Sequence, residues 1–270
     1  MADAQEFLRA GKLSAAIEHV SQEVKANPAD YRRRTFLFEL LCFAGDLDRA
    51  DEELEVVGQQ SSDSELAVQP YRNVLQAERA RRRLFSEGLR PHLQPVTPHY
   101  AELHFEALNC LREGQPGKAR LLLEEAEASR PALAGRLNGN WAFEDFKDCD
   151  DLIGPFLEAF IEAEYNWIPW EAVSLVSIEP PKHSRDLIWI PARIELREGN
   201  GGEAFLPVLY ANSHLHCDER VRLGRATNWR PDIQELALGL GQRLFAAGDR
   251  DFPMLEVRQI EFEHANTTSH

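Results

Sequence analysis

The segment HLHCDE, residues 214–219, holds the side chains best suited to metal chemistry in this sequence. On a strand, alternate residues face the same side, so His214 and His216 would present two imidazoles together. Cys217 or Asp218 could supply a third ligand, as in a metal-dependent or hydrolytic enzyme. The segment is short and polar, and no second cluster in the sequence completes a four-ligand shell. A solvated loop is the alternative interpretation.

Other catalytic patterns are missing from the sequence. No G-x-S-x-G elbow is present, and Ser174 and Ser177 lie inside a predicted strand, where a hydroxyl usually bonds to the backbone. The run GNGG lacks the helix and lysine of a phosphate-binding loop, so it predicts a turn. The acidic cluster from Glu144 to Asp151 does not fit an EF-hand, because Lys147 occupies the third loop position. We therefore expect no catalytic residue and no cofactor.

Three of the five tryptophans, Trp167, Trp170 and Trp189, lie close together in the sequence. A buried tryptophan usually fills a core, whereas an exposed one often anchors a partner. Both interpretations stay open from the sequence. As a partner-binding site, the three rings would be the apolar anchors, and Arg185 and Asp186 would lie at the rim.

The charge balance argues against a polyanionic partner. Lys and Arg total 30 against 45 Asp and Glu, which gives a formal net charge of -15. Such a protein repels nucleic acid and has no general attraction to anionic lipid. The basic runs at 32–34 and 79–83 oppose this balance, but arginines in helices usually form an ion-paired face. We expect neither nucleic acid nor a membrane as a partner.

Targeting features and cysteine spacing both indicate a cytoplasmic protein. The N-terminus MADAQEFLRAGKLSAA has no basic region followed by an apolar one, and no window approaches the ~18–20 apolar residues of a membrane span. Cys42, Cys110, Cys149 and Cys217 lie far apart, with no C-x-x-C motif. We expect four free thiols rather than a zinc site or a disulfide framework.

An internal repeat organises the first half of the chain. The pattern A-G-x-L-x-x-A begins at Ala10 and again 34 residues later at Ala44, and a third copy provides Gly114 and Ala119. This period is typical of tetratricopeptide helix hairpins, in which the glycine forms the tight turn and the alanine lets two helices cross closely. Residues 1–135 are therefore predicted to form a tetratricopeptide-like helical domain, whose grooves would hold a peptide or a helix.

The pattern changes near residue 135, where GRLNGNWAFEDFKDCDD marks a domain boundary. Residues 136–270 are predicted to form an α+β domain. A leading helix is expected over 151–165, because Asp151 can cap it and its apolar residues recur at helical spacing. Those residues are Ile153, Phe156, Leu157, Phe160 and Ile161.

From Trp167 onwards the period of the apolar residues is two. Apolar residues alternate from Ile188 to Leu196, and EAFLPVLY is expected to return as the second strand of a hairpin. FPMLEVRQIEFEH predicts a strand with a bulge at 258–259, and ELALGLGQRLFAAGD fits either a helix or a bent strand. Short strands with tight turns predict a small β-barrel or curled sheet of the SH3-like kind.

The segments LFELLCFAGDLDRA, RDLIWIPA and GGEAFLPVLY together carry a family resemblance. The chain resembles the ImpE family, also called TagJ, whose members are accessory proteins of bacterial type VI secretion. The resemblance covers nearly the whole chain. It provides no catalytic motif and no contact residues to transfer.

The resemblance implies a non-enzymatic adaptor. Family members are associated with the contractile sheath and bind its small subunit through that subunit's N-terminal amphipathic helix. A role in sheath assembly or recycling follows, with an indirect link to the sheath-recycling ATPase and with no cofactor. The alternative function is the metal-dependent or hydrolytic enzyme based on His214, His216 and Cys217.

Overall fold

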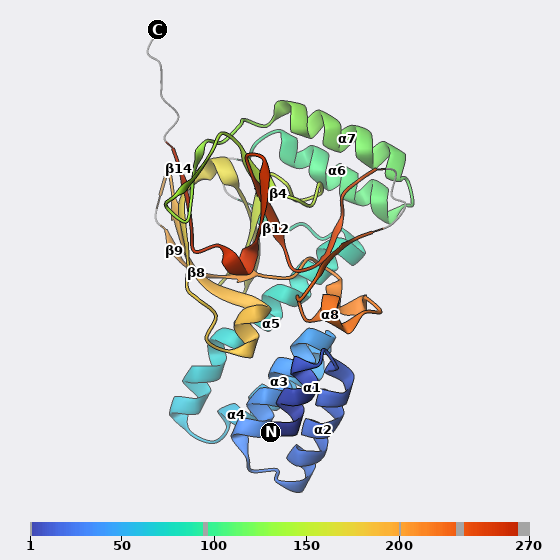
Figure 1. Ribbon diagram of the computed structural model, residues 1–270, viewed down its shortest axis with the longest axis vertical. Coiled ribbons are helices and arrows are strands. Elements are labelled where there is room, and N and C mark those ends of the chain that lie inside the picture. The colour runs from blue at the N-terminus through green and yellow to red at the C-terminus, as the bar shows by residue number, and fades with distance from the viewer. Residues whose placement is uncertain (1, 94–96, 200, 231–234, 264–270) are drawn as a thin grey trace.

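The chain has an α+β fold in which most helices come first and the strands follow (Figure 1). The computed structural model describes residues 2–93, 97–199, 201–230 and 235–263. The helices are α1 (Ala2–Arg9), α2 (Leu13–Ala26), α3 (Tyr31–Ala44), α4 (Leu47–Gly58), α5 (Ser62–Glu87), α6 (Tyr100–Arg112), α7 (Pro116–Ser129) and α8 (Glu219–Arg222). The short 3₁₀ turns are η1 (Trp170–Ala172), η2 (Ser184–Leu187), η3 (Ser213–Leu215) and η4 (Met254–Glu256). In the described part of the chain, no helix combines the length and the apolar composition of a membrane span.

Each copy of the repeat forms a helix hairpin, in the pairs α1–α2, α3–α4 and α6–α7. The turn glycines Gly11, Gly45 and Gly114 have φ values of 73°, 79° and 72°, a region that side chains other than glycine rarely adopt. Ala50 and Ala119 are completely buried where the paired helices meet. The repeat therefore predicts the helix pairs correctly, and their assignment to the tetratricopeptide class stays a prediction.

Helix α5 connects the hairpins to the sheets. Ser61 caps its first turn, and Gly88 ends it in the left-handed conformation. It packs on α4 and also contacts β5 and β6. Figure 1 shows α5 running from the group of α1–α4 towards the sheets. The helical part and the strands are thus in direct contact, and the predicted domain boundary at residue 135 stays a prediction.

Most strands belong to one nine-stranded sheet in the order β1-β6-β5-β9-β8-β7-β14-β2-β3. A second sheet has the order β13-β12-β4, and β10 pairs with β11. The strands of the large sheet are β1 (His92–Leu93), β2 (Gly135–Leu137), β3 (Trp141–Phe143), β5 (Phe156–Ile161), β6 (Glu164–Pro169), β7 (Val173–Ile178), β8 (Trp189–Leu196), β9 (Gly202–Pro207) and β14 (Gln259–Phe262). The others are β4 (Phe146–Asp148), β10 (Thr227–Trp229), β11 (Gly239–Gly241), β12 (Leu244–Ala247) and β13 (Arg250–Pro253).

Of the two predicted alternatives, a small barrel or a curled sheet, the closed barrel is wrong, and the SH3-like description stays a prediction. Strands β1 and β3 lie at the two ends of the sheet order, and no pairing among the described residues joins them. The β8–β9 hairpin forms as predicted, with Ile190 opposite Leu206. Alternation identifies single strands, but closure depends on distant pairings such as β1 with β6 and β14 with β2. Sequence periodicity contains no information about those pairings.

The predicted helix over 151–165 is also wrong, because the segment forms the β5–β6 hairpin. All residues from Phe156 to Phe160 are buried, so both faces of β5 are covered. A strand buried on both sides is apolar at nearly every position, and a short run of this kind also satisfies helical spacing. Glu158, which would face solvent on a helix, points into the interior.

The end of the chain differs from the predicted bulged strand. Strand β13 ends at Pro253, the 3₁₀ turn η4 follows, and β14 begins at Gln259. The turn redirects the chain from the small sheet into the large sheet, where β14 pairs with β7 and β2. The ambiguous segment before it forms strands β11 and β12 rather than a helix.

A buried ionic network joins α5 to the sheets. Glu158 on β5 accepts hydrogen bonds from Nε and Nη2 of Arg81 on α5, at 2.8 and 2.9 Å. It also pairs with Nη2 of Arg243, and the Nη1 of Arg243 donates to Oδ2 of Asp148 at 2.7 Å. The hydroxyl of Tyr165 donates to Glu158 as well. All these charged side chains are at most 3% exposed.

The two guanidiniums keep the buried carboxylate ionised. Burial raises the pKa of Glu158, but Arg81 and Arg243 outweigh that effect and lower the pKa to about 2. Burial lowers the pKa of Arg81, and Glu158 more than reverses it, so the pKa of Arg81 lies above its usual value. Glu158 is therefore the carboxylate that the two buried guanidiniums share, and its removal would leave both of them short of counter-charge.

We predict that Glu158→Gln destabilises the protein by about 3–5 kcal/mol, because two guanidiniums then stay buried without the carboxylate between them. Urea unfolding of the full chain measures the change. Arg193→Gln on the exposed part of β8 is the matched control and should change stability by less than about 0.5 kcal/mol. A loss below about 1 kcal/mol for Glu158→Gln would contradict the assignment of this network as a major structural contact.

Candidate functional site

Two of the predicted tryptophan anchors are completely buried in different parts of the core. Trp167 stacks between Phe105 of α6 and Phe156 of β5, with ring centroids 5.1 and 4.9 Å apart. Trp170 packs against aromatic rings of β4 and β12, including Phe146 at 4.9 Å. The two side chains therefore join separate layers and present no surface to a partner in this conformation.

The other residues of the predicted anchor site are buried or make contacts within the chain. Trp189 is 3% exposed. Arg185 lies over the ring of Tyr71 at 4.6 Å and donates to Oε1 of Glu39 on α3 at 2.9 Å. Asp186 is buried and accepts backbone hydrogen bonds within its own turn. The structure does not bring these residues together with Trp167 and Trp170 into one exposed patch.

The predicted metal cluster does not converge on a common point. His214 packs on the αα turn at Gly45, where an added Cβ would lie 2.3 Å from its ring. Burial, with Arg82 nearby, lowers the pKa of His214 to about 4, so the ring is neutral. His216 accepts a hydrogen bond from the backbone of Asp218 at Nδ1, and Cys217 is exposed. Among the residues that the structure describes, no group of three His, Cys, Asp or Glu could hold a metal ion.

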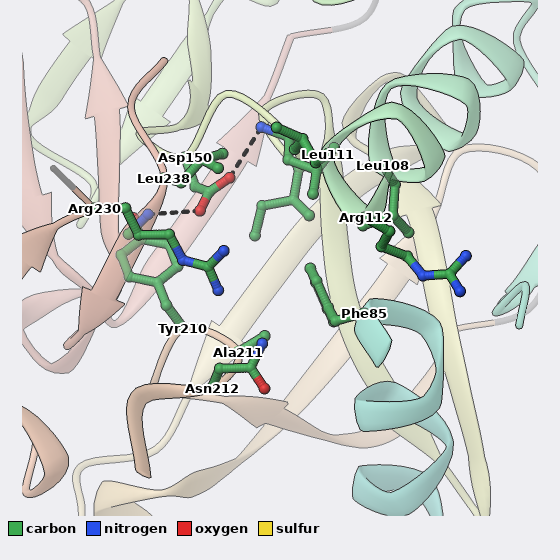
Figure 2. Close-up of a pocket in the computed structure, with 13 residues that line it drawn as sticks. Phe85, Leu108, Leu111, Arg112, Asp150, Tyr210, Ala211, Asn212, Arg230 and Leu238 are labelled. Atoms are coloured by element: carbon green, nitrogen blue, oxygen red, sulfur yellow. Dashed lines mark hydrogen bonds between the residues drawn. The ribbon is translucent and has the colours of Figure 1, made fainter. Parts of the chain in front are cut away.

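A cavity lies where the ends of α5 and α6 meet the loop before β5 and the β10–β11 hairpin (Figure 2). Its volume is about 180 Å³, which is smaller than the roughly 300–1,000 Å³ typical of drug-sized ligand sites. Most of its lining is apolar. The apolar side chains are Phe85, Leu108, Leu111, Leu152, Ile153, Tyr210, Ala211 and Leu238.

The backbone of β11 shapes one wall of this cavity. The ring of Tyr210 packs directly on the backbone of Gly239. A Cβ added to Gly239 would lie only 2.3 Å from ring atoms of Tyr210, so this wall requires glycine. The hydroxyl of Tyr210 points away into the core, where it is 2.9 Å from Oδ1 of Asp148 and accepts a hydrogen bond from the backbone of Leu244. The cavity thus borders the buried ionic network through Tyr210 and Asp148.

The polar groups of the cavity are Asp150, Asn212, Arg112 and Arg230. Asp150 accepts hydrogen bonds from the backbone of Leu152 at 2.9 Å and of Gly239 at 2.7 Å. Figure 2 shows the guanidinium of Arg230 pointing into the cavity and that of Arg112 pointing away. The contacts of Arg112 are with Asn109 and the backbone of Ser86.

The described lining of the cavity offers apolar side chains and a cation. No serine, cysteine, histidine or lysine is among the described residues that line it, so it contains no pair of nucleophile and base. Both oxygens of Asp150 are used by backbone amides. What remains is an apolar recess with one inward-pointing cation, which fits an apolar group next to a negative charge.

Sequence reasoning identified the residues around the cavity only in part. The acidic cluster that includes Asp150 does not fit a calcium loop, and in the structure that carboxylate accepts a hydrogen bond from the backbone of Gly239 on β11. No sequence signal pointed to Arg230 or Leu238, because they meet α6 only through tertiary packing.

The part of the chain that forms most of the cavity is also the part matched by a family model. The model for the ImpE protein matches residues 140–261. A curated relative, the type VI secretion system accessory component TagJ of Pseudomonas aeruginosa, is 34% identical over 260 residues, which cover 96% of this chain and 91% of the relative. The chain belongs to the ImpE family. Asp150, Tyr210, Arg230 and Gly239 all lie inside the segment that the ImpE model matches.

A solved structure has the same fold as this ImpE-family chain. The crystal structure of protein VPA1032 from Vibrio parahaemolyticus matches it with a TM-score of 0.90, covering 98% of each chain at 23% sequence identity. At that identity the likeness concerns the fold alone. The open nine-stranded sheet described for this ImpE-family chain therefore belongs to an architecture that crystallography has observed.

We predict that Asp150 makes the stability of the protein fall as the pH rises from 5 to 7.5. Burial, reinforced by Asp148, raises its pKa to about 7, so the folded state binds this proton more tightly than the unfolded state does. The stabilisation is complete below about pH 4 and is lost as the pH rises through 7. The difference in unfolding free energy between wild type and Asp150→Asn should shrink over this range.

Asp218→Asn is the matched control for that measurement. The hydrogen bonds from Arg220 lower the pKa of the partly exposed Asp218 to about 2, so it does not titrate between pH 5 and 7.5. Its difference from wild type should be constant over that range. A constant difference for Asp150→Asn as well would show that this carboxyl titrates normally.

We predict that protein purified without a polyhistidine tag contains no stoichiometric metal. His214 is occupied by packing against Gly45, and Nδ1 of His216 is occupied by a backbone hydrogen bond, so the remaining donors are too few for a tight site. Elemental analysis after dialysis measures the content. One equivalent of zinc that is lost in His216→Ala would contradict this expectation and revive the enzyme alternative.

Proposed function

We propose that this protein is a non-enzymatic, cytoplasmic accessory component of a bacterial type VI secretion system. In this role it binds the small subunit of the contractile sheath through that subunit's amphipathic N-terminal helix. The observation that carries the proposal is the 34% identity, over 96% of the chain, to the accessory component TagJ. The consequence of binding would be a change in sheath assembly or in recycling by the sheath ATPase.

The architecture supports a binding role. Stacked helix pairs and sheet-to-helix junctions offer concave surfaces that receive a partner helix. The candidate cavity lies at such a junction, and its described lining contains no set of catalytic groups. The net charge of -15 also opposes the alternative partners, nucleic acid and anionic membrane.

The cavity is a better candidate for the partner-binding site than the tryptophans proposed from the sequence. Trp167, Trp170 and Trp189 are at most 3% exposed, so they would touch a partner only after the core had opened. Arg185 and Asp186 already hold partners within the chain. The cavity is partly open without any rearrangement.

We predict that a peptide of the sheath subunit's N-terminal helix binds the full-length protein with a dissociation constant in the micromolar range. This corresponds to a standard binding free energy of about -8 kcal/mol. Isothermal titration calorimetry and co-elution measure the binding. A scrambled peptide of the same composition is the control, because it retains the charge but loses the apolar face. Absence of heat and of co-elution at tens of micromolar peptide would contradict the proposed function.

A further inference from the structure

The guanidinium of Arg230 has no partner among the residues that the structure describes. Its backbone amide donates to the carbonyl of Leu238 at 2.9 Å, which fixes the residue at the end of β10. Across the described residues, no ion pair or hydrogen bond engages its side chain, which points into the cavity in Figure 2. The neighbouring carboxylate, Asp150, is turned towards the amides of Leu152 and Gly239. Arg230 therefore presents an uncompensated positive charge to whatever enters.

This charge stands out against the rest of the protein. The chain has 45 acidic and 30 basic side chains, and most arginines of the described helices form ion pairs, such as Arg34 with Glu53 and Arg83 with Glu87. An arginine that is half-buried and unpaired has lost part of its hydration without gaining a counter-charge. A carboxylate supplied from outside would restore that balance through a bidentate hydrogen bond.

The shape of the cavity defines the other half of the ligand. Its apolar lining and volume of about 180 Å³ fit one aliphatic or aromatic side chain rather than a cofactor. Leu108, Leu152 and Leu238 are each at most 4% exposed and belong to its lining. On a helix, residues three or four positions apart lie on the same face about 5–6 Å apart, so one helix can offer an apolar and an acidic side chain together.

We propose that this cavity is a docking site for a helical segment of a partner protein. The segment would insert one apolar side chain between α6 and β11 and place a carboxylate, three or four positions away, against Arg230. This inference goes beyond the proposed function, because it specifies the chemistry of the segment and does not require the sheath subunit to supply it. A small-molecule carboxylate and an extended peptide are the competing occupants.

The test is a selection from a displayed library of helical 16-residue peptides with random surface positions, with the full-length protein as target. Enriched peptides should combine Leu, Ile, Phe or Met with Asp or Glu at a spacing of three or four. The affinity of the best synthetic peptide is then measured by calorimetry for wild type and variants. Arg230→Glu should weaken it at least about tenfold, and Arg230→Lys should weaken it less.

Two further variants separate the cavity from general charge effects. Ala211→Phe fills the recess from its rim and should abolish binding while leaving Arg230 in place. Arg193→Glu changes the charge equally on the exposed part of β8 and should alter affinity less than about twofold. Thermal unfolding of each variant confirms that it is folded.

Several outcomes would overturn the proposal. These are enrichment of no apolar–acidic pattern, a pattern with a spacing of two that indicates an extended peptide, or equal binding by wild type and Arg230→Glu. Failure of the sheath peptide to bind, with the selected pattern still dependent on Arg230, would reject the proposed partner and keep the docking site.

Discussion

The buried carboxylate of Glu158 is the contact on which the rest of this structure depends. Arg81 and Arg243, which are 77 and 85 residues away in the sequence, both pair with it in the interior. Desolvating three charges is costly, and the cost is offset only because every charged group finds hydrogen-bond partners. Arg81 also donates to the carbonyl of Leu209 at 3.0 Å, so the long helix, the large sheet and the chain before η3 share one anchor.

This network positions one wall of the candidate binding cavity. Arg243 holds Asp148 and lies 5.4 Å from the ring centroid of Tyr210, and Tyr210 forms one wall of the cavity. A binding site next to a core held by buried ion pairs is pre-organised, so binding costs little free energy for ordering the site. Arg230 lines the cavity but lies outside the network that neutralises Arg81 and Arg243, so the cavity keeps a positive charge in a strongly acidic protein.

Much of the helical half could be predicted, and the physical reason is that its structure is local. The glycine and the alanine of each repeat predict a tight turn and a close helix crossing, and both features lie within one repeat of about 34 residues. The sheet half was predicted less well. Strand β8 was recognised because one of its faces is partly exposed and its residues alternate, whereas β5 was mistaken for a helix because both of its faces are covered. The cavity could not be predicted, since Phe85, Leu108, Tyr210 and Leu238 meet only in three dimensions.

The sequence by itself determined the class of protein: the helix pairs, the alternating strands, the acidic charge and the membership of the ImpE family. Only the tertiary structure decided which of the conspicuous residues are available. Trp167 and Trp170 could have been anchors or core, and they became core because sheet and helix close over both of them. Arg81 and Arg230 are the same residue type, yet one lies beside a buried carboxylate and the other beside an open recess. Burial and counter-charge are properties of distant chain segments brought together, so periodicity along the chain cannot specify them.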